Sequence, residues 1–527
     1  MNSKSDATPD QERDNSINRS GKISSSRSSR LLATILSGWV RSAIILAIGM
    51  YATPRLLELL GKERFGVARM SEQWFLYLDL LTFGLASTFG VLLIRVATTQ
   101  PSSALPGVVK YGIRCLYRQF AWIVPVGIVM ILAFPFVYKL SPELRNEFYW
   151  GSTAVMVGMI LGPWVVFRYA LEARQTGYLV ESALLAQSIV ITLSAIAFAY
   201  CGFGLTGQMW TTTLGAVVFS GLCIFQMGGF QRKFWAPSTP MVSSERLWGL
   251  QWPIFIASVG NQINVLSDNI VTGYLINAAS VSALIVTTRL FQVCRTVAGS
   301  LNGNGMWTGL VDIRTRVGPE AFSARFAEAS KLNIGINLLV LGPVLACNRR
   351  FVELWVGGDL YGGDTLTVCT MLQMSTFNAV CLYTAVIDSL GQTRKRVWFS
   401  SLGTMVKLVL LYPLVRWFGI AAIPLATALG FLACDAWFNP LILIRDYQVS
   451  SKKIVDGTLR AVGLGAFWAM TCYFIGHRSA YLMTGWIGLM AEGVTLELMG
   501  LILAWLFLLT GEERKVWKKR ILGLAGR

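Results

Sequence analysis

Three basic side chains lie in the middle of long apolar segments, and they are the residues best placed to do chemistry. They are Arg41, Arg289 and Lys407, central in the segments 31–53, 279–300 and 397–416. A cation at the depth of a bilayer is costly, so such a residue indicates a functional site by default. Arginine binds phosphate through paired hydrogen bonds and lysine binds it as a point charge. The three residues therefore predict a site for a phosphate-bearing ligand.

The apolar segment 251–276 carries a stripe of polar side chains. Asn261, Asn264, Asp268 and Thr272 follow at spacings of three or four, so they share one face of a helix. Amides both donate and accept hydrogen bonds, which suits sugar hydroxyls, and we predict sugar binding for the two asparagines. Asp268 is predicted to carry a coupling ion or to neutralise Arg289. Hydrogen bonding between helices is an alternative reason for the same stripe.

Acidic residues elsewhere in the apolar segments are further candidates. Asp435 lies in the segment 419–443 and Glu492 in the segment 481–510. A carboxyl group in apolar surroundings suits a proton carrier, and it equally suits a hydrogen-bonded structural role. We predict ion coupling for Asp435 and a structural role for Glu492. Each intramembrane cation has a matching alternative, in which it pairs with an acid or extends toward a membrane interface.

The composition places these residues in a polytopic α-helical membrane protein. Of 527 residues, 54% are hydrophobic and only 14% are charged, whereas soluble domains carry about 25% charged residues. Apolar runs of about 20 residues predict membrane-spanning helices. The fourteen predicted helices are 31–53, 72–94, 119–138, 150–167, 178–200, 206–229, 251–276, 279–300, 331–347, 365–388, 397–416, 419–443, 461–476 and 481–510.

The charge distribution predicts the orientation of the chain. The formal net charge is +18, and 33 of the 46 Lys and Arg residues fall on one side of the predicted helices. The positive-inside rule assigns that side, with both termini, to the cytoplasm. Membrane topology, rather than nucleic-acid binding, therefore explains the positive net charge. Nine scattered cysteines and a single histidine, His477, predict neither a metal site nor a cofactor.

An internal repeat divides the chain into halves. FGLTGQMWTTTLG at 203–215 and FGIAAIPLATALG at 418–430 share five residues at one offset and open the sixth and twelfth predicted helices. Two six-helix bundles of this kind build transporters, with the substrate bound between them. The predicted organisation is a disordered tail at 1–30, bundles at 31–230 and 251–445 joined by a linker at 231–250, a loop and two extra helices at 446–510, and a basic tail at 511–527.

Several motifs resemble one family in their order and spacing. They are LLGKERFGVARM with LDLLTFGLAST, FVELWVGGD, and SLGQTRKRVWFSSLG followed by RWFGIAAIPLATALG. Together they resemble the polysaccharide and O-antigen exporters of the multidrug/oligosaccharidyl-lipid/polysaccharide (MOP) flippase superfamily, over residues 31–445. The stretch SLNGNGMWTGL departs from the family, because it lacks the proline-containing pattern expected there.

The resemblance implies a MATE-like fold and a flippase that moves an undecaprenyl-diphosphate-linked oligosaccharide across the bacterial inner membrane. It also implies alternating access, coupling to protons or sodium, and cooperation with a polysaccharide polymerase and other assembly proteins. On this view Arg41 compensates the diphosphate.

A lipid II flippase and a MATE-type multidrug extruder remain alternatives on the same fold. Drug extruders of the superfamily often carry an acid in the first helix, where this chain has Arg41. A membrane glycosyltransferase or ligase is less favoured, because the predicted outer loops are short. No P-loop motif is present, and a transporter is expected rather than an enzyme.

Overall fold

The computed structural model describes residues 9–99, 105–228, 244–301, 307–479, 485–515 and 517–518. These residues are almost entirely helical, and they contain no strand. The described residues of all fourteen predicted segments are mainly helical, although turns interrupt 72–94 at Phe83–Gly84 and 279–300 at Thr288. Ten helical stretches of the described chain are long and apolar enough to cross a membrane. Two of them, Leu36–Thr82 and Thr393–Tyr447, contain 47 and 55 residues, enough for two crossings each at about 20 residues a span.

The chain folds as two compact units, which are described separately. The first comprises Met1–Arg64 and Trp74–Phe255, and the second comprises Phe65–Gln73 and Ile256–Arg527. The limits of the predicted domains stay predictions, although the change of unit at Phe255 falls just after the predicted linker. Helices up to the end of the first half are α1 (Pro9–Leu76), α2 (Leu85–Thr99), α3 (Leu105–Val137), α4 (Pro142–Leu161), α5 (Val165–Ala173), α6 (Gly177–Tyr200) and α7 (Gly204–Gln226).

The remaining helices build the second half and the C-terminal pair. They are α9 (Ser244–Leu275), α10 (Ala278–Thr287), α11 (Arg289–Leu301), α12 (Trp307–Arg316), α13 (Pro319–Val356), α14 (Asp364–Ser389), α15 (Thr393–Phe418), α16 (Ala422–Gly430), α17 (Ala436–Tyr447), α18 (Ser451–Ser479) and α19 (Gly485–Leu503). A π-helical turn, Phe431–Asp435, joins α16 to α17.

Helix α1 extends beyond the predicted helix 31–53 in both directions. It begins at Pro9, inside the segment 1–30 that we predict as a disordered tail. Proline suits the first turn of a helix, and the next proline is Pro54, so the helix of the apolar segment extends backward without a break. The backbone leaves the helical region at Gly61, with φ 76° and ψ 166°. This glycine separates the first predicted span from the second.

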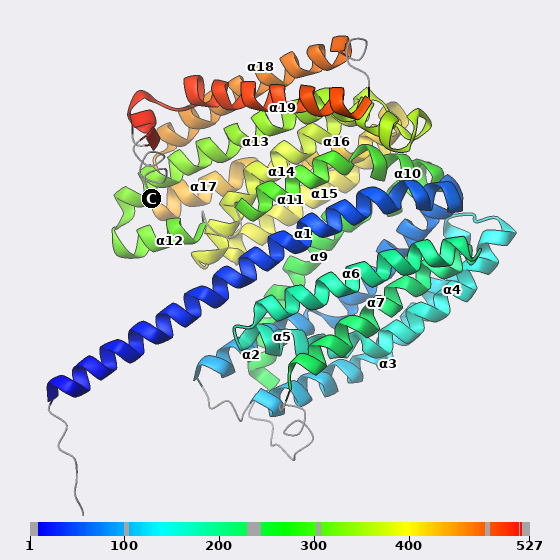
Figure 1. The fold of residues 1–527 in the computed structure, drawn as a ribbon, viewed down its shortest axis with the longest axis horizontal. Coiled ribbons are helices and arrows are strands. Elements are labelled where there is room, and N and C mark those ends of the chain that lie inside the picture. Colours follow the sequence, from blue (N-terminus) through cyan, green and yellow to red (C-terminus); the bar gives the residue numbers. More distant parts are fainter. Residues whose placement is uncertain are drawn as a thin grey trace, which may run out of the picture. The chain divides into compact units, whose positions relative to one another are not determined.

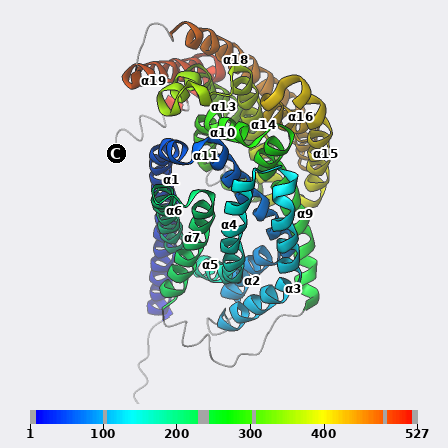
Figure 2. The same ribbon diagram turned by 90° about the vertical axis from the view of Figure 1, so that its right-hand side faces the viewer.

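In the first unit α7 is packed between α4 and α6 (Figure 2). Residues of α2, α3 and α5 form a second buried cluster around Phe89 and Val166, which also includes residues of α6 and α7. A Cβ atom added at Gly215 of α7 would lie 2.5 Å from Ile191 of α6. Small residues therefore allow the close helix contacts that stabilise membrane bundles.

In the second unit α13 is a central helix, with α14, α18 and α19 packed against it (Figure 1). The C-terminal pair is thus part of this unit. Trp468 of α18 is buried and donates a hydrogen bond from Nε1 to the Leu339 carbonyl oxygen, at 3.1 Å. Arg350 of α13 and Glu492 of α19 form a buried ion pair at 2.6 Å. This contact agrees with the structural role expected for Glu492.

The two copies of the repeat form the same local structure. Gly204 opens α7 with φ 50°, and Gly419 precedes α16 with φ 54°, a conformation that favours glycine in both turns. The glycines at the ends of the two copies, Gly215 and Gly430, both face the preceding long helix at short range. The repeat therefore encodes a tight turn followed by a close helix pair in each half.

The Gly403–Gly430 contact of α15 with α16 yields a stability prediction. A Cβ at Gly403 would lie 2.8 Å from the Gly430 oxygen, and one at Gly430 would lie 2.6 Å from the Gly403 oxygen. We expect Gly403→Leu to destabilise the protein by about 1–3 kcal/mol, because overpacking forces the backbones apart. The measurement is the Tm of the purified protein in detergent. Gly463→Leu is the control, because open space surrounds Gly463; equal Tm values for the two variants would contradict the contact.

Candidate functional site

Arg41 of α1 is neutralised within the first unit. Its Nε lies 2.6 Å from Oε2 of Glu181 in α6, and the two side chains are 29% and 21% exposed. The atoms meet as an ion pair without the angular geometry of a hydrogen bond. Gly38, about one turn before Arg41, leaves room for the carboxylate. The alternative that the sequence left open, pairing with an acid, therefore describes Arg41 in this structure.

Lys407 of α15 is neutralised within the second unit. Its Nζ donates hydrogen bonds to Oδ1 of Asp268 at 2.8 Å and to Oγ of Ser267 at 3.2 Å. The lysine side chain is only 1% exposed. Asp268 thus pairs with Lys407 rather than with Arg289, and the lysine is packed between helices. Its position does not favour the predicted contact with substrate.

The two ion pairs occupy equivalent helices of the two halves. Arg41–Glu181 joins the first and fifth predicted spans of its half, and Asp268–Lys407 joins the first and fifth spans of the other. The charges are exchanged, because the first span carries the cation in one half and the anion in the other. Each half therefore balances its own intramembrane charge between the same two spans.

Arg289 differs from the other two cations. It is the first residue of α11, directly after the one-residue interruption at Thr288. Its Nε is buried without a hydrogen-bond partner, and the described residues give it no ion pair. The charge of Arg69, a second cation of the same unit, acts on it, and Arg69 contacts Glu72 at 2.9 Å. Arg289 is thus a half-buried cation that lacks a counter-ion within the described chain.

Asp435 closes the π-helical turn and is 3% exposed. Two residues of α15 act on the carboxylate, Arg396 through its charge and Ser400 through its hydroxyl group. A Cβ at Gly403 would lie 3.3 Å from Oδ2, so the glycine leaves space for the acid. π-Helical turns often occur at functional sites. The predicted role of Asp435 in ion coupling stays a prediction.

The polar stripe of α9 is described only in part. The side chains of Asn261 and Asn264 lie outside the described residues, so their predicted contact with sugar stays a prediction. Thr272 donates from Oγ1 to the Asp268 carbonyl oxygen at 2.7 Å. Interhelical amide bonding does occur elsewhere in the unit, where Asn378 of α14 donates to Oδ1 of Asn337 in α13 at 3.1 Å.

Sequence reasoning missed two residues of this arrangement. Glu181 lies near the start of the apolar segment 178–200. An acidic residue in an apolar segment is unusual, and that feature could have identified it from the sequence. Arg69 lies between the predicted helices 31–53 and 72–94, on the outer side of the membrane, where a positive charge fits the positive-inside rule poorly. That misfit was the signal that Arg69 is not an ordinary loop residue.

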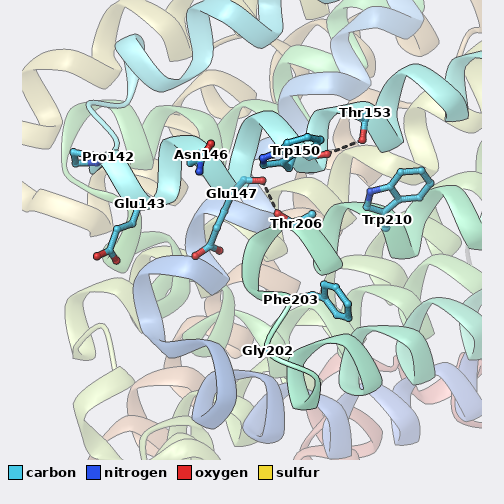
Figure 3. Close-up of a pocket in the computed structure, with 10 residues that line it drawn as sticks. All are labelled: Pro142, Glu143, Asn146, Glu147, Trp150, Thr153, Gly202, Phe203, Thr206 and Trp210. Atoms are coloured by element: carbon cyan, nitrogen blue, oxygen red, sulfur yellow. Dashed lines mark hydrogen bonds between the residues drawn. The ribbon is translucent and has the colours of Figure 1, made fainter.

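A pocket of about 970 Å³ opens on the first unit between α4 and α7, separate from these charges (Figure 3). Trp150 and Trp210 line it together with Glu143, Asn146 and Glu147. Glu147 is already engaged, because it accepts hydrogen bonds from Arg64 at 2.9 Å and from the backbone of Leu205 at 2.7 Å. None of the residues predicted from the sequence lines this pocket.

Known structures share this architecture. The chain aligns with the lipid II flippase MurJ in an inward closed conformation, with a TM-score of 0.61 at 13% identity, over 88% of this chain and 97% of that one. It aligns with an inward-facing multidrug resistance MATE family transporter of the MOP superfamily with a TM-score of 0.61 at 14% identity, over 82% and 99% of the two chains. No family model matches the sequence, and no curated protein matches it.

These alignments define the class of the molecule by its fold. The chain is an all-α, multi-pass membrane protein with the MATE-like fold of MOP-superfamily transporters, so the predicted fold class is confirmed. The same fold is found in a lipid flippase and in drug transporters. The particular substrate must therefore be argued from the charges of this chain.

The Arg41–Glu181 pair yields a second prediction. We expect Arg41→Ala and Glu181→Ala each to lower stability by up to about 3–5 kcal/mol, because each leaves the other charge unpaired in the membrane. The exchanged variant Arg41→Glu/Glu181→Arg should recover most of the loss. Tm and the yield of monodisperse protein are the measurements, and Arg55→Ala, which removes an exposed local pair, is the control. Wild-type Tm in both single variants would contradict the pairing.

Proposed function

We propose that the chain is a flippase that moves an undecaprenyl-diphosphate-linked oligosaccharide across the bacterial inner membrane by alternating access, for O-antigen or exopolysaccharide export. The observation that carries the proposal is Arg289, whose guanidinium Nε is buried without a hydrogen-bond partner among the residues that the structure describes. A charge held at that depth without a counter-ion is expensive. A bound anion would supply the missing charge.

The chemistry of Arg289 suits a diphosphate. A guanidinium donates two parallel hydrogen bonds to phosphate oxygens, and in a partly dehydrated site these charge-assisted bonds are strong. Arg69 lies within electrostatic reach of the same guanidinium, although it is itself paired with Glu72. The positive charge of Arg289 would repel a cationic drug. This polarity favours an anionic substrate over the substrates of multidrug extruders.

Two features of the chain support the remainder of the proposal. A lipid II flippase is among the proteins of similar fold, which supports flipping of a lipid as the type of transport. The excess of Lys and Arg on one side of the spans supports an inner-membrane orientation with both termini in the cytoplasm. Coupling to protons or sodium through Asp435, and docking of a polymerase or other assembly proteins, belong to the same proposal.

Flux in proteoliposomes tests the proposal. A labelled undecaprenyl-diphosphate oligosaccharide is scored for access to a membrane-impermeant reagent, with and without a pH gradient. We expect Arg289→Ala to lower flux at least about tenfold, because one charged hydrogen bond contributes about 1.5–3 kcal/mol. Arg289→Lys should restore part of the flux, since it keeps the charge without the paired geometry. Arg349→Ala, which removes an exposed arginine paired with Glu353, is the control.

Two results would overturn the assignment. Wild-type flux in Arg289→Ala would remove this arginine from the site. Transport of a cationic dye without transport of the labelled lipid would identify a multidrug extruder on the same fold. Lipid II, offered in the same assay, distinguishes the two lipid substrates by their relative rates.

A further inference from the structure

The Asp268–Ser267 corner of α9 has the properties of a cation site. Asp268 presents a carboxylate oxygen to Lys407 Nζ, and Ser267 presents a hydroxyl oxygen to the same atom. The Ser267 hydroxyl donates its own hydrogen to the Ile263 carbonyl oxygen, so only its lone pairs face the ammonium group. Oxygen atoms that offer lone pairs and one negative charge are the ligands of hard cations.

A cation is already held in this corner by the chain itself. The ammonium group of Lys407 lies at 2.8 Å from the carboxylate, and the side chain is 1% exposed. The lysine stem is also confined, because a Cβ placed at Gly430 of α16 would lie 3.3 Å from Lys407 Cβ. The stem therefore passes through the close contact between α15 and α16, which limits its freedom to leave.

The cation of the first unit's ion pair is less buried than that of the second. Arg41 retains 29% exposure against 1% for Lys407, whereas the two acids, Glu181 at 21% and Asp268 at 23%, are similarly exposed. An extended guanidinium also spreads its charge over a planar group, whereas an ammonium group is a compact point charge. Of the two pairs, only the lysine pair places a compact, buried cation against a carboxylate oxygen and a hydroxyl oxygen.

We propose that Lys407 is a resident cation that fills a monovalent-cation site formed by Asp268 and Ser267. In the wild-type protein the amine occupies the place that a free sodium ion or small ammonium ion would take. Removal of the amine opens the site to such ions. The inference depends only on contacts inside the second unit, and it is independent of the transported substrate.

The consequence for ion coupling is specific. Asp268 is neutralised by a covalently attached partner, so it does not exchange a free metal ion during a cycle. Of the two acids predicted to couple ions, Asp435 is then the one that remains for this role. It is buried in the same unit, and Arg396, a cation that acts on its carboxylate, is itself paired with Asp388 at 2.7 Å.

Thermal stability in defined salts tests the inference. Purified wild type, Lys407→Ala and Lys407→Ala/Asp268→Asn are compared in choline chloride and in sodium, methylammonium or propylammonium chloride at equal ionic strength. We expect the wild-type Tm to be the same in all four salts. Lys407→Ala should have a low Tm in choline that rises saturably, by several degrees, with sodium or a small amine, because ligand binding stabilises the folded state. The double variant should lose this response.

A second measurement covers the case in which Lys407→Ala does not fold. Lys407→Met keeps the apolar volume of the stem, and equilibrium binding of radioactive sodium is then compared between this variant and the wild type. We expect sodium binding by Lys407→Met, which Asp268→Asn abolishes, and no such binding by the wild type.

Two outcomes would overturn the inference. One is saturable sodium binding by the wild type that Asp268→Asn abolishes, since the site would then admit free ions beside the lysine. The other is a folded Lys407 variant that responds to none of the cations, since the oxygens would then not form a site. Both results come from binding to purified protein, so neither decides whether the lipid-linked oligosaccharide is transported.

Discussion

Charge at membrane depth must be neutralised, and the organisation of each unit follows from that constraint. The cost of an unpaired ion in apolar surroundings is several kcal/mol. The chain meets it with ion pairs between helices, at Arg41–Glu181, Lys407–Asp268 and Arg350–Glu492. Each pair joins helices far apart in the sequence. The pairs therefore select which helices become neighbours, while small residues at the contacts let the backbones approach.

The two halves place the cation and the anion of their ion pairs on opposite spans, and this comparison bears on the role of Arg289. Each half balances one cation against one anion between its first and fifth spans, so these four residues contribute no net charge to a ligand. Arg289 stands outside this balance. We therefore propose the phosphate-binding role for Arg289, whereas the family resemblance of the sequence pointed to Arg41. In the same way, the amine of Lys407 neutralises Asp268, which leaves Asp435 as the acid proposed to couple an ion.

Glycine residues position the charged groups in two ways, by allowing sharp turns between helices and by allowing helices to pack closely. Gly61 interrupts α1, and the positive-φ glycines Gly204 and Gly419 open the last span of each half. Gly403 and Gly430 then bring α15 and α16 together around Lys407 and beside Asp435. Local backbone freedom thus sets the helix contacts, and the helix contacts enclose the charged groups.

The sequence by itself determined the membrane class, the approximate limits of the spans, the repeat and the identity of the three intramembrane cations. Hydropathy, charge bias and glycine placement are local properties, so they are readable without a structure. Only the tertiary structure decided the partners. Asp268 and Lys407 are 139 residues apart, and each residue turns a helix by about 100°, so a small error in rotation changes every interhelical contact. The pairing of Arg41, the burial of Lys407 and the lack of a counter-ion for Arg289 within the described part of the chain all depend on those rotations.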